Sequence, residues 1–197
     1  MEDLPVTAYA LMESISEEIP EGHFIASDPI LQYLAETRDA DLNKLIVAKD
    51  CKPLRTIYAT INGVGQEECL LDNGSMIVSM SKEVATQLGL TWDPLITIDM
   101  ESASNHVERT LGIARNAKFT LGGLNFFLQV HILEHPPYRV LLGRPFDTLV
   151  RLITRTNDNG SSEVVLTDPN TKKVTVIPTY PRGKGPEELQ KSKFPGF

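Results

Sequence analysis

The stretch Leu70-Leu71-Asp72-Asn73-Gly74-Ser75 is the most informative part of the sequence. Two apolar residues lead into an acidic residue, the chain turns at a glycine, and a second apolar run, Met76-Ile77-Val78, follows. This order predicts a carboxylate on a tight turn between two strands, with the backbone held on both sides. An ordinary hairpin that turns at Asn-Gly has the same order, so the surrounding sequence has to separate the two interpretations.

Strand-forming residues surround this turn. The run from Thr56 to Ile61 is rich in β-branched and aromatic side chains, and Asn62-Gly63 is a strong hairpin signal. The return strand is expected from Glu67 to Leu71, ending at the acidic turn. After the turn, we expect the chain to be extended from Met76 to Met80.

A short helix is expected next, with Ser81 as its N-cap and Gly89 at its end. Pro145-Phe146 should open a second short helix. Short strands separated by turn signals favour a mostly β domain with a closed or sandwiched architecture. The further strands expected are Leu95 to Met100, Val107 to Ala114, Ala117 to Leu121, Leu124 to Leu133, Val140 to Leu142, Glu163 to Thr167 and Lys173 to Ile177.

Composition divides the chain of 197 residues into three parts. The net charge is −7, and residues 1–50 alone hold eleven Asp and Glu against three Lys and Arg, or −8. We therefore expect an acidic N-terminal leader over residues 1–52 with a short helix after Ser27, a domain over 53–180, and a flexible Pro-, Gly- and Lys-rich tail over 181–197. Acidity argues against a nucleic-acid partner.

The expected setting is intracellular, soluble and cytoplasmic. Two cysteines, Cys51 and Cys69, do not make a disulfide framework. The N-terminal residues lack the basic and apolar regions of a signal peptide. No apolar run approaches the length of a membrane span, so no membrane partner is expected.

Three segments in order resemble the retropepsin family, the aspartic proteases of retroviruses and retrotransposons. They are the acid turn at 70–75, the helix Ser81-Lys82-Glu83-Val84-Ala85-Thr86-Gln87-Leu88-Gly89-Leu90, and the closing segment Val140-Leu141-Leu142-Gly143-Arg144-Pro145-Phe146. The run as a whole looks most like protease segments of fungal, gypsy-type retrotransposon polyproteins. The resemblance covers roughly residues 54–150 and implies a closed retropepsin-like β-barrel, about the size of one compact domain.

The resemblance also implies an aspartic endopeptidase that cuts peptide or polyprotein substrates as a homodimer, without a metal or organic cofactor. Its flap hairpin would fall between Ile98 and Leu111. Gly143 would let the closing strand pass close to the acid turn, although a plain glycine before a helix is an equal alternative. The site residues implied are Asp72 as the catalytic acid, Asn73, Gly74 and Ser75 in its turn, Ser102, Ala103, Ser104, Asn105 and His106 at the flap tip, and Leu142, Gly143 and Arg144 in the closing loop.

One aspartate cannot perform this reaction alone. Peptide hydrolysis by carboxylates needs one ionised group to take a proton from water and one protonated group to polarise the carbonyl. Two adjacent carboxylates share a proton and titrate as a pair. A two-fold homodimer that joins Asp72 to its symmetry mate is the economical solution. The sequence Asp-Asn-Gly-Ser of the acid turn occurs a second time, at Asp158-Asn159-Gly160-Ser161. Polar residues precede this second copy, so we interpret it as a hairpin turn.

Two features leave alternatives. The family normally has Ser or Thr where this chain has Asn73, which has both a donor and an acceptor but is bulkier. The alternative to an enzyme is therefore a degenerate retropepsin-like module that dimerises or binds peptides. His131-Ile132-Leu133-Glu134-His135 matches a zinc-protease pattern, but on a strand positions four apart lie about 13 Å from each other, too far to share one ion.

Overall fold

A computed structural model describes residues 33, 54–101, 107–157 and 159–186. The acidic leader expected over 1–52, apart from Tyr33, and the five residues expected at the flap tip lie outside the described residues. No helix among the residues that the structure describes is long and apolar enough to cross a membrane.

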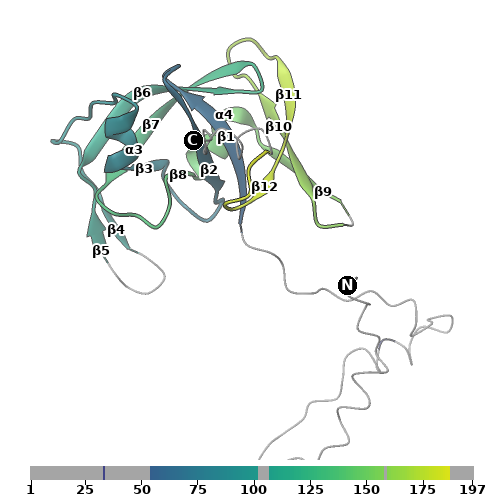
Figure 1. The fold of residues 1–197 in the computed structure, drawn as a ribbon, viewed down its shortest axis with the longest axis horizontal. Coiled ribbons are helices and arrows are strands. Elements are labelled where there is room, and N and C mark those ends of the chain that lie inside the picture. Colours follow the sequence, from purple (N-terminus) through teal and green to yellow (C-terminus); the bar gives the residue numbers. More distant parts are fainter. Residues whose placement is uncertain (1–32, 34–53, 102–106, 158, 187–197) are drawn as a thin grey trace, which may run out of the picture. The chain divides into compact units, whose positions relative to one another are not determined.

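The described chain is mostly β, with two short helices (Figure 1). In chain order its elements are β1 (Arg55–Ile61), β2 (Gly65–Leu71), β3 (Ser79–Ser81), α3 (Lys82–Gln87), β4 (Asp99–Glu101), β5 (Val107–Arg109), β6 (Gly112–Leu121), β7 (Leu124–Leu133), β8 (Val140–Leu142), α4 (Arg144–Val150), β9 (Ile153–Thr156), β10 (Ser162–Thr167), β11 (Val174–Pro178) and β12 (Tyr180–Pro181).

Six of these strands form a closed barrel in the order β1-β2-β8-β3-β7-β6. The barrel closes because β1 pairs with β2 along its length and also with β6 at Thr60 and Ile61. At its other end β1 pairs with β12. A separate three-stranded sheet has the order β11-β10-β9, and β4 pairs with β5 in a hairpin. The expected closed β-barrel with one or two short helices is thus confirmed.

Local sequence explains the tightest turns and the first helix. Asn62 and Gly63 both have positive φ, 50° and 71°, as a hairpin turn between β1 and β2 requires. The hydroxyl oxygen of Ser81 accepts a hydrogen bond of 3.2 Å from the backbone N–H of Val84, which caps α3 as expected. Gly89, at φ 65°, follows the helix and ends it.

Alternating side chains fill the barrel. The inward positions of β6 and β7 are fully or almost fully buried, and three phenylalanines, Phe119, Phe126 and Phe146, are the largest fully buried side chains. The rings of Phe126 and Phe146 pack edge to face with centroids 6.4 Å apart. This contact joins β7 to α4, so the core fixes the helix that follows the closing strand.

Four expected elements differ in the structure. Extended structure was expected from Met76, but β3 begins only at Ser79, because the chain bends at residues 76 and 77 to leave the acid turn. The strand expected over Leu95 to Met100 is reduced to β4. The strands expected at 107–114 and 117–121 instead form β5 and a single long β6 with an irregularity between Ala114 and Ala117.

Candidate active site

Asp72 stands directly after β2, on a turn that is closed by its own backbone and side chain. The N–H of Ser75 donates to the Asp72 carbonyl at 3.1 Å, and the N–H of Gly74 donates to the carboxylate oxygen Oδ1 at 3.0 Å. Asp72 itself is partly buried. One carboxylate oxygen is therefore held by the turn, which restricts the direction in which the other can point.

The closing strand β8 holds this turn from both sides. β8 lies between β2 and β3, parallel to the first and antiparallel to the second. The backbone N–H of Asp72 continues the β2–β8 ladder with a hydrogen bond of 3.1 Å to the Leu142 carbonyl. β8 is far from the acid turn in the sequence. In the fold, β8 lies between β2 and β3, which separate at the acid turn.

Gly143 touches the turn so closely that only glycine fits. A Cβ atom there would lie 2.2 Å from the carbonyl oxygen of Ile77 and 2.6 Å from that of Ser75. The next residue, Arg144, donates its backbone N–H to the Ser75 carbonyl at 2.9 Å. Of the two interpretations of Gly143, close approach to the acid turn is therefore the one that the structure supports.

The other turn residues have different surroundings. The hydroxyl of Ser75 donates to the Ile77 carbonyl at 3.2 Å and accepts from the Ile77 N–H at 3.4 Å, so it stabilises the second half of the turn. Asn73 is exposed, and its side chain makes no hydrogen bond within the described part of the chain. Asn73 is thus free for a contact outside the domain.

A second carboxyl group, that of Asp147, is near enough to feel the charge of Asp72. Asp147 belongs to the first turn of α4, the helix that begins next to Gly143. Partial burial raises the pKa of Asp147, the Arg144 guanidinium counteracts this, and the charge of Asp72 raises it further. Arg144 is exposed and makes no ion pair with any described carboxylate. Sequence reasoning missed Asp147, although its place in the first turn of the expected helix was visible.

Tyr138 is a further neighbour that the sequence did not reveal. Its hydroxyl and that of Ser79 form a hydrogen bond of 2.9 Å, in which either group can donate. Burial is the main cause that raises the pKa of Tyr138; the Ser79 bond lowers it, and the charges of Glu108 and Asp72 raise it. Tyr138 is therefore close enough to Asp72 and to Glu108 of β5 for both charges to act on its hydroxyl.

The β4–β5 hairpin falls within the segment, Ile98 to Leu111, where the resemblance implies a flap. Asp99 pairs with Arg109 and Glu101 with Val107, so the two strands lead directly to the tip. The tip, Ser102 to His106, is outside the described residues. At the base, the hydroxyl of Thr110 accepts a hydrogen bond of 3.0 Å from the Ile98 N–H, which closes the hairpin between its two flanks.

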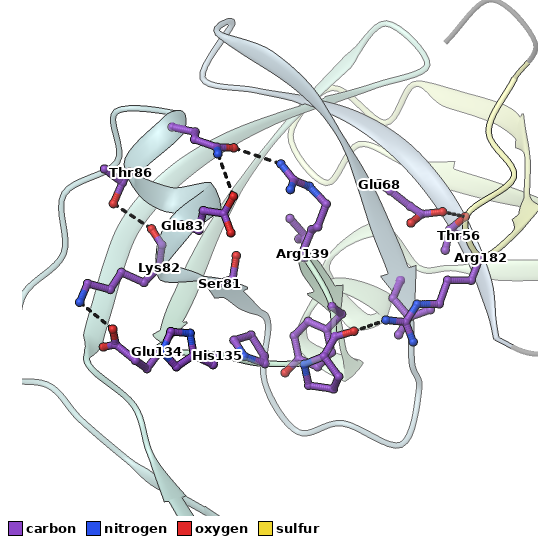
Figure 2. A pocket seen from close by; sticks show the side chains of 16 residues that line it. Thr56, Glu68, Ser81, Lys82, Glu83, Thr86, Glu134, His135, Arg139 and Arg182 are labelled. Atoms are coloured by element: carbon purple, nitrogen blue, oxygen red, sulfur yellow. Dashed lines mark hydrogen bonds and ion pairs between the residues drawn. The ribbon is translucent and has the colours of Figure 1, made fainter. Parts of the chain in front are cut away.

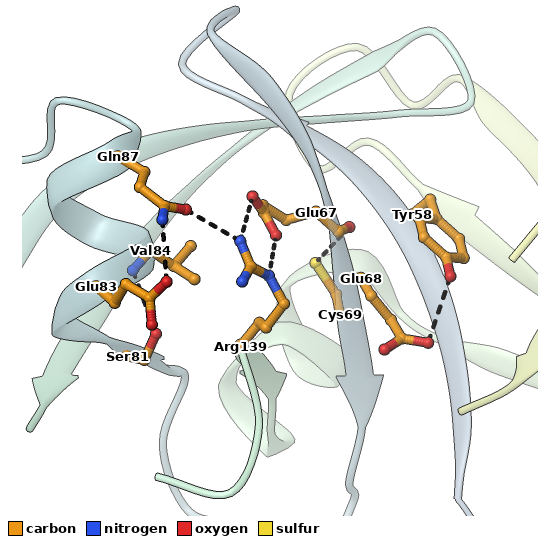
Figure 3. Close-up of polar contacts among 9 residues, drawn as sticks. All are labelled: Tyr58, Glu67, Glu68, Cys69, Ser81, Glu83, Val84, Gln87 and Arg139. Carbon is orange, nitrogen blue, oxygen red and sulfur yellow. Dashed lines mark hydrogen bonds and ion pairs between the residues drawn. The ribbon is translucent and has the colours of Figure 1, made fainter. Parts of the chain in front are cut away.

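A cavity of about 740 Å³ opens beside the site (Figure 2). It lies between α3, the ends of β2 and β8, the loop after β7, and the segment after β12, and the residues of the acid turn do not line it. In the wall of this cavity the Arg139 guanidinium donates to both carboxylate oxygens of Glu67, at 2.6 and 3.0 Å, and to the Gln87 side chain at 3.2 Å (Figure 3). Arg139 thus ties the loop to β2 and α3.

The two histidines of the zinc-protease pattern do not lie on one helix. His131 lies on β7, as the strand interpretation requires, and His135 lies in the loop beyond that strand. Burial lowers the pKa of His131. Among the residues that the structure describes, no three His, Cys, Asp or Glu side chains come together in a way that could hold a metal ion.

Comparisons with known proteins agree with this geometry. A family model described as aspartyl protease matches residues 57–146, from β1 to the start of α4. Among solved structures, the retroviral protease-like domain of Ddi1 from Leishmania major matches with a TM-score of 0.52 and 17% sequence identity, over 70% of this chain and 100% of that one. A search of curated protein sequences gives no significant match. The described part of the chain therefore carries an aspartyl protease-like domain with the fold of retroviral proteases.

Proposed function

We propose that this domain is an aspartic endopeptidase that cleaves extended peptide or polyprotein segments as a homodimer. The observation that carries the proposal is the acid turn, in which Asp72 is held between β2 and β8 with one carboxylate oxygen bonded to the Gly74 N–H. Such a fixed carboxylate suits a group that must meet a reacting water in one orientation. We further propose that the parent chain is a retrotransposon-type polyprotein that acts inside the cell.

The reaction needs a second carboxyl group, which the partner's copy of Asp72 would supply. The ionised member of the pair takes a proton from water, and the protonated member donates a hydrogen bond to the scissile carbonyl. The two groups exchange these roles as the tetrahedral intermediate collapses. Because the pair must hold one proton, activity should be greatest at acidic to mildly acidic pH.

An apolar surface on the three-stranded sheet supports self-association. Ile153, Val165 and Val176 are cross-strand neighbours on β9, β10 and β11, and Ile153 and Val176 are 56% and 49% exposed. All four residues of the edge strand β9 are exposed. A second copy of the chain is the partner that we propose for this surface, because edge strands readily pair and the acid turn lacks a second carboxylate.

The same side of the domain carries the other parts that a dimeric site needs. In Figure 1, the β4–β5 hairpin and β9 both project from the lower side of the barrel, on either side of the ends of β2 and β8. The seven residues of α4 bridge from Gly143, at the acid turn, toward β9, a length of about 10 Å for a helix. A substrate would then add as an extended strand beneath the hairpin.

Replacement of Asp72 by asparagine tests the enzyme. Asparagine keeps an oxygen for the Gly74 N–H but cannot take a proton from water. The wild-type chain should cleave members of a degenerate decapeptide library at acidic pH, and Asp72→Asn should lose at least about 10³-fold in rate, a loss typical for an essential acid or base. Circular dichroism should show the same fold in both proteins. Equal cleavage by the two proteins would refute the proposal.

Asn73 favours one alternative, a degenerate module that dimerises or binds peptides without cutting them. Its exposed side chain makes no hydrogen bond within the described residues, in a position where the retropepsin family normally has a hydroxyl. A statine-type transition-state mimic separates the two functions, because an active pair binds it tightly at one molecule per dimer. The variant Asn73→Thr restores the hydroxyl and gives the complementary test. If this variant binds the mimic and cleaves peptides while the natural chain does neither, the natural chain is the degenerate module.

A further inference from the structure

The cavity beside the acid turn lies on the same face of β2 as Asp72. Glu68 and Leu70 line it, whereas the intervening Cys69 is completely buried in the barrel. Successive residues of a strand point to opposite faces, and the Asp72 N–H continues the β2–β8 ladder. Side chains 68, 70 and 72 therefore follow one another along one face, at spacings of about 7 Å.

The part of the cavity nearest to Asp72 is apolar. Leu70, almost fully buried, forms its floor, and Pro137 and Tyr138 also line it. These residues offer carbon surface, apart from the tyrosine hydroxyl, which is already bonded to Ser79. An apolar side chain of a peptide fits this part, because burial of carbon atoms is the main gain that it offers.

The far part of the cavity presents a carboxylate that has no cationic partner. Oxygen Oε1 of Glu68 accepts hydrogen bonds from the hydroxyls of Thr56 and Tyr58, at 3.2 and 3.3 Å, and from the Gly183 N–H at 2.7 Å. All three donors are neutral groups. Within the described residues Glu68 makes no ion pair, although its charge is among those that raise the pKa of Arg139.

The lysine and the two arginines that line the cavity have other partners. Arg139 is bonded to both oxygens of Glu67, and Lys82 is paired with Glu134 at 2.7 Å. Arg182 donates to the carbonyl oxygen of Pro137 rather than to Glu68, as Figure 2 shows. The carboxylate is therefore held by three neutral donors and has no ion pair among the described residues, an arrangement that favours a charged donor from a ligand.

We infer that Glu68 is a specificity-determining residue that binds a lysine or arginine side chain of the peptide substrate. In this arrangement an apolar side chain of the peptide packs on Leu70. The basic residue is two positions further from the scissile bond than that apolar residue. The inference rests on the proposed peptidase function. Alternate residues of an extended peptide are separated by about 7 Å, which matches the spacing from Leu70 to Glu68. A two-fold dimer has one such site on each side of the scissile bond.

Cleavage profiling tests this inference. The wild-type chain should cut a degenerate decapeptide library with Lys and Arg enriched about threefold to tenfold at one position on each side of the scissile bond, the range expected for a partly exposed charged contact. Glu68→Gln keeps an acceptor for the three neutral donors and removes only the charge, so it should abolish the enrichment while cleavage continues. Asp93→Asn removes a carboxylate that does not line the cavity and should leave the profile unchanged. Cleavage without basic enrichment, or enrichment that survives Glu68→Gln, overturns the inference.

A binding measurement keeps the inference testable if the chain cleaves nothing. The Gly183 amide, which is bonded to Glu68, is a local reporter in a ¹⁵N spectrum of the full chain. Acetyl-Leu-Ala-Arg-methylamide should shift this resonance saturably, and acetyl-Leu-Ala-Gln-methylamide should require at least about threefold higher concentration. The difference should vanish in Glu68→Gln. Equal responses to the two probes would overturn the role of Glu68, whether or not the domain is a peptidase.

Discussion

The backbone N–H of Asp72 donates a hydrogen bond of 3.1 Å to the carbonyl oxygen of Leu142, so the acid turn and the closing strand share one ladder. Gly143 follows at once and lies against the Ser75 and Ile77 carbonyls. The position of the carboxylate is thus set by two segments far apart in the sequence. Neither the acid turn nor the closing segment could hold Asp72 in place without the other.

Gly143→Ala should therefore destabilise the domain strongly. The added methyl would lie within 2.6 Å of two backbone carbonyl oxygens, which cannot move without opening the turn. We expect the free energy of unfolding to fall by at least about 2 kcal/mol, near the upper part of the range for overpacking. Urea denaturation followed by circular dichroism measures it.

Gly65→Ala is the matched control. A Cβ at Gly65 would meet only the end of the Leu88 side chain, at 3.3 Å, and a side-chain rotation can relieve that contact. We expect a change of less than about 1 kcal/mol. Similar losses in both variants would mean that the close approach of Gly143 to the turn is not what the fold depends on.

Local patterns predicted the parts of the site that lie within one segment. The acid turn, the capped helix α3 and the strand that ends at Gly143 each carry their own signal: a glycine turn, a serine cap and an apolar run. The Asn-Gly hairpin between β1 and β2 belongs to the same class. Such signals depend on neighbouring residues only, and so they can be recognised without knowledge of the fold.

Contacts between distant segments could not be predicted in this way. The strand β9 is fully exposed and has no alternation of burial, and β12 contains only two residues, so neither has a pattern to recognise. Tyr138 and Asp147 become neighbours of Asp72 only when β8 inserts between β2 and β3. The pair of Glu67 with Arg139 likewise has no sequence signal.

The ion pair between Glu67 and Arg139 should stabilise the domain more than an ordinary surface pair. The geometry is bidentate, and the Glu67 side chain is only 12% exposed, against 43% for Arg139. Arg139→Met should cost about 1–2 kcal/mol of unfolding free energy, because it leaves a largely buried carboxylate without its partner. A double-mutant cycle with Glu67→Gln should give a coupling energy of about 1 kcal/mol.

The pair of Lys82 with Glu134 is the control for that cycle. Both side chains are more than 40% exposed, and the contact is a single 2.7 Å bond. Its coupling energy should not exceed about 0.5 kcal/mol, since exposed pairs are screened by solvent. If the two pairs have equal coupling energies, burial of Glu67 does not strengthen its ion pair.

We propose that the homodimer forms through the exposed apolar surface of the three-stranded sheet. The variant Ile153→Lys tests this interface. A lysine on β9 places a charge on the 56% exposed position that should be covered by the second copy. We expect the dissociation constant of the dimer, measured by sedimentation, to rise at least about tenfold. Val64→Lys replaces a residue that is 63% exposed at the β1–β2 turn and should leave association unchanged. Dimers of equal stability in both variants would place the interface elsewhere.

The tyrosine beside Glu68 gives a prediction at alkaline pH. Burial raises the pKa of Tyr58 to about 12 from 10.0, and the charge and hydrogen bond of Glu68 add to the shift. A raised pKa in the folded state means that this contribution to stability is complete below pH 10 and is lost as the pH rises toward 12. Tyrosinate absorbance of the wild type minus that of Tyr58→Phe should therefore show a transition well above pH 10. Glu68→Gln should move this transition to lower pH; if it stays in place, Glu68 does not hold the tyrosine proton and the hydrogen bond between them has no electrostatic effect.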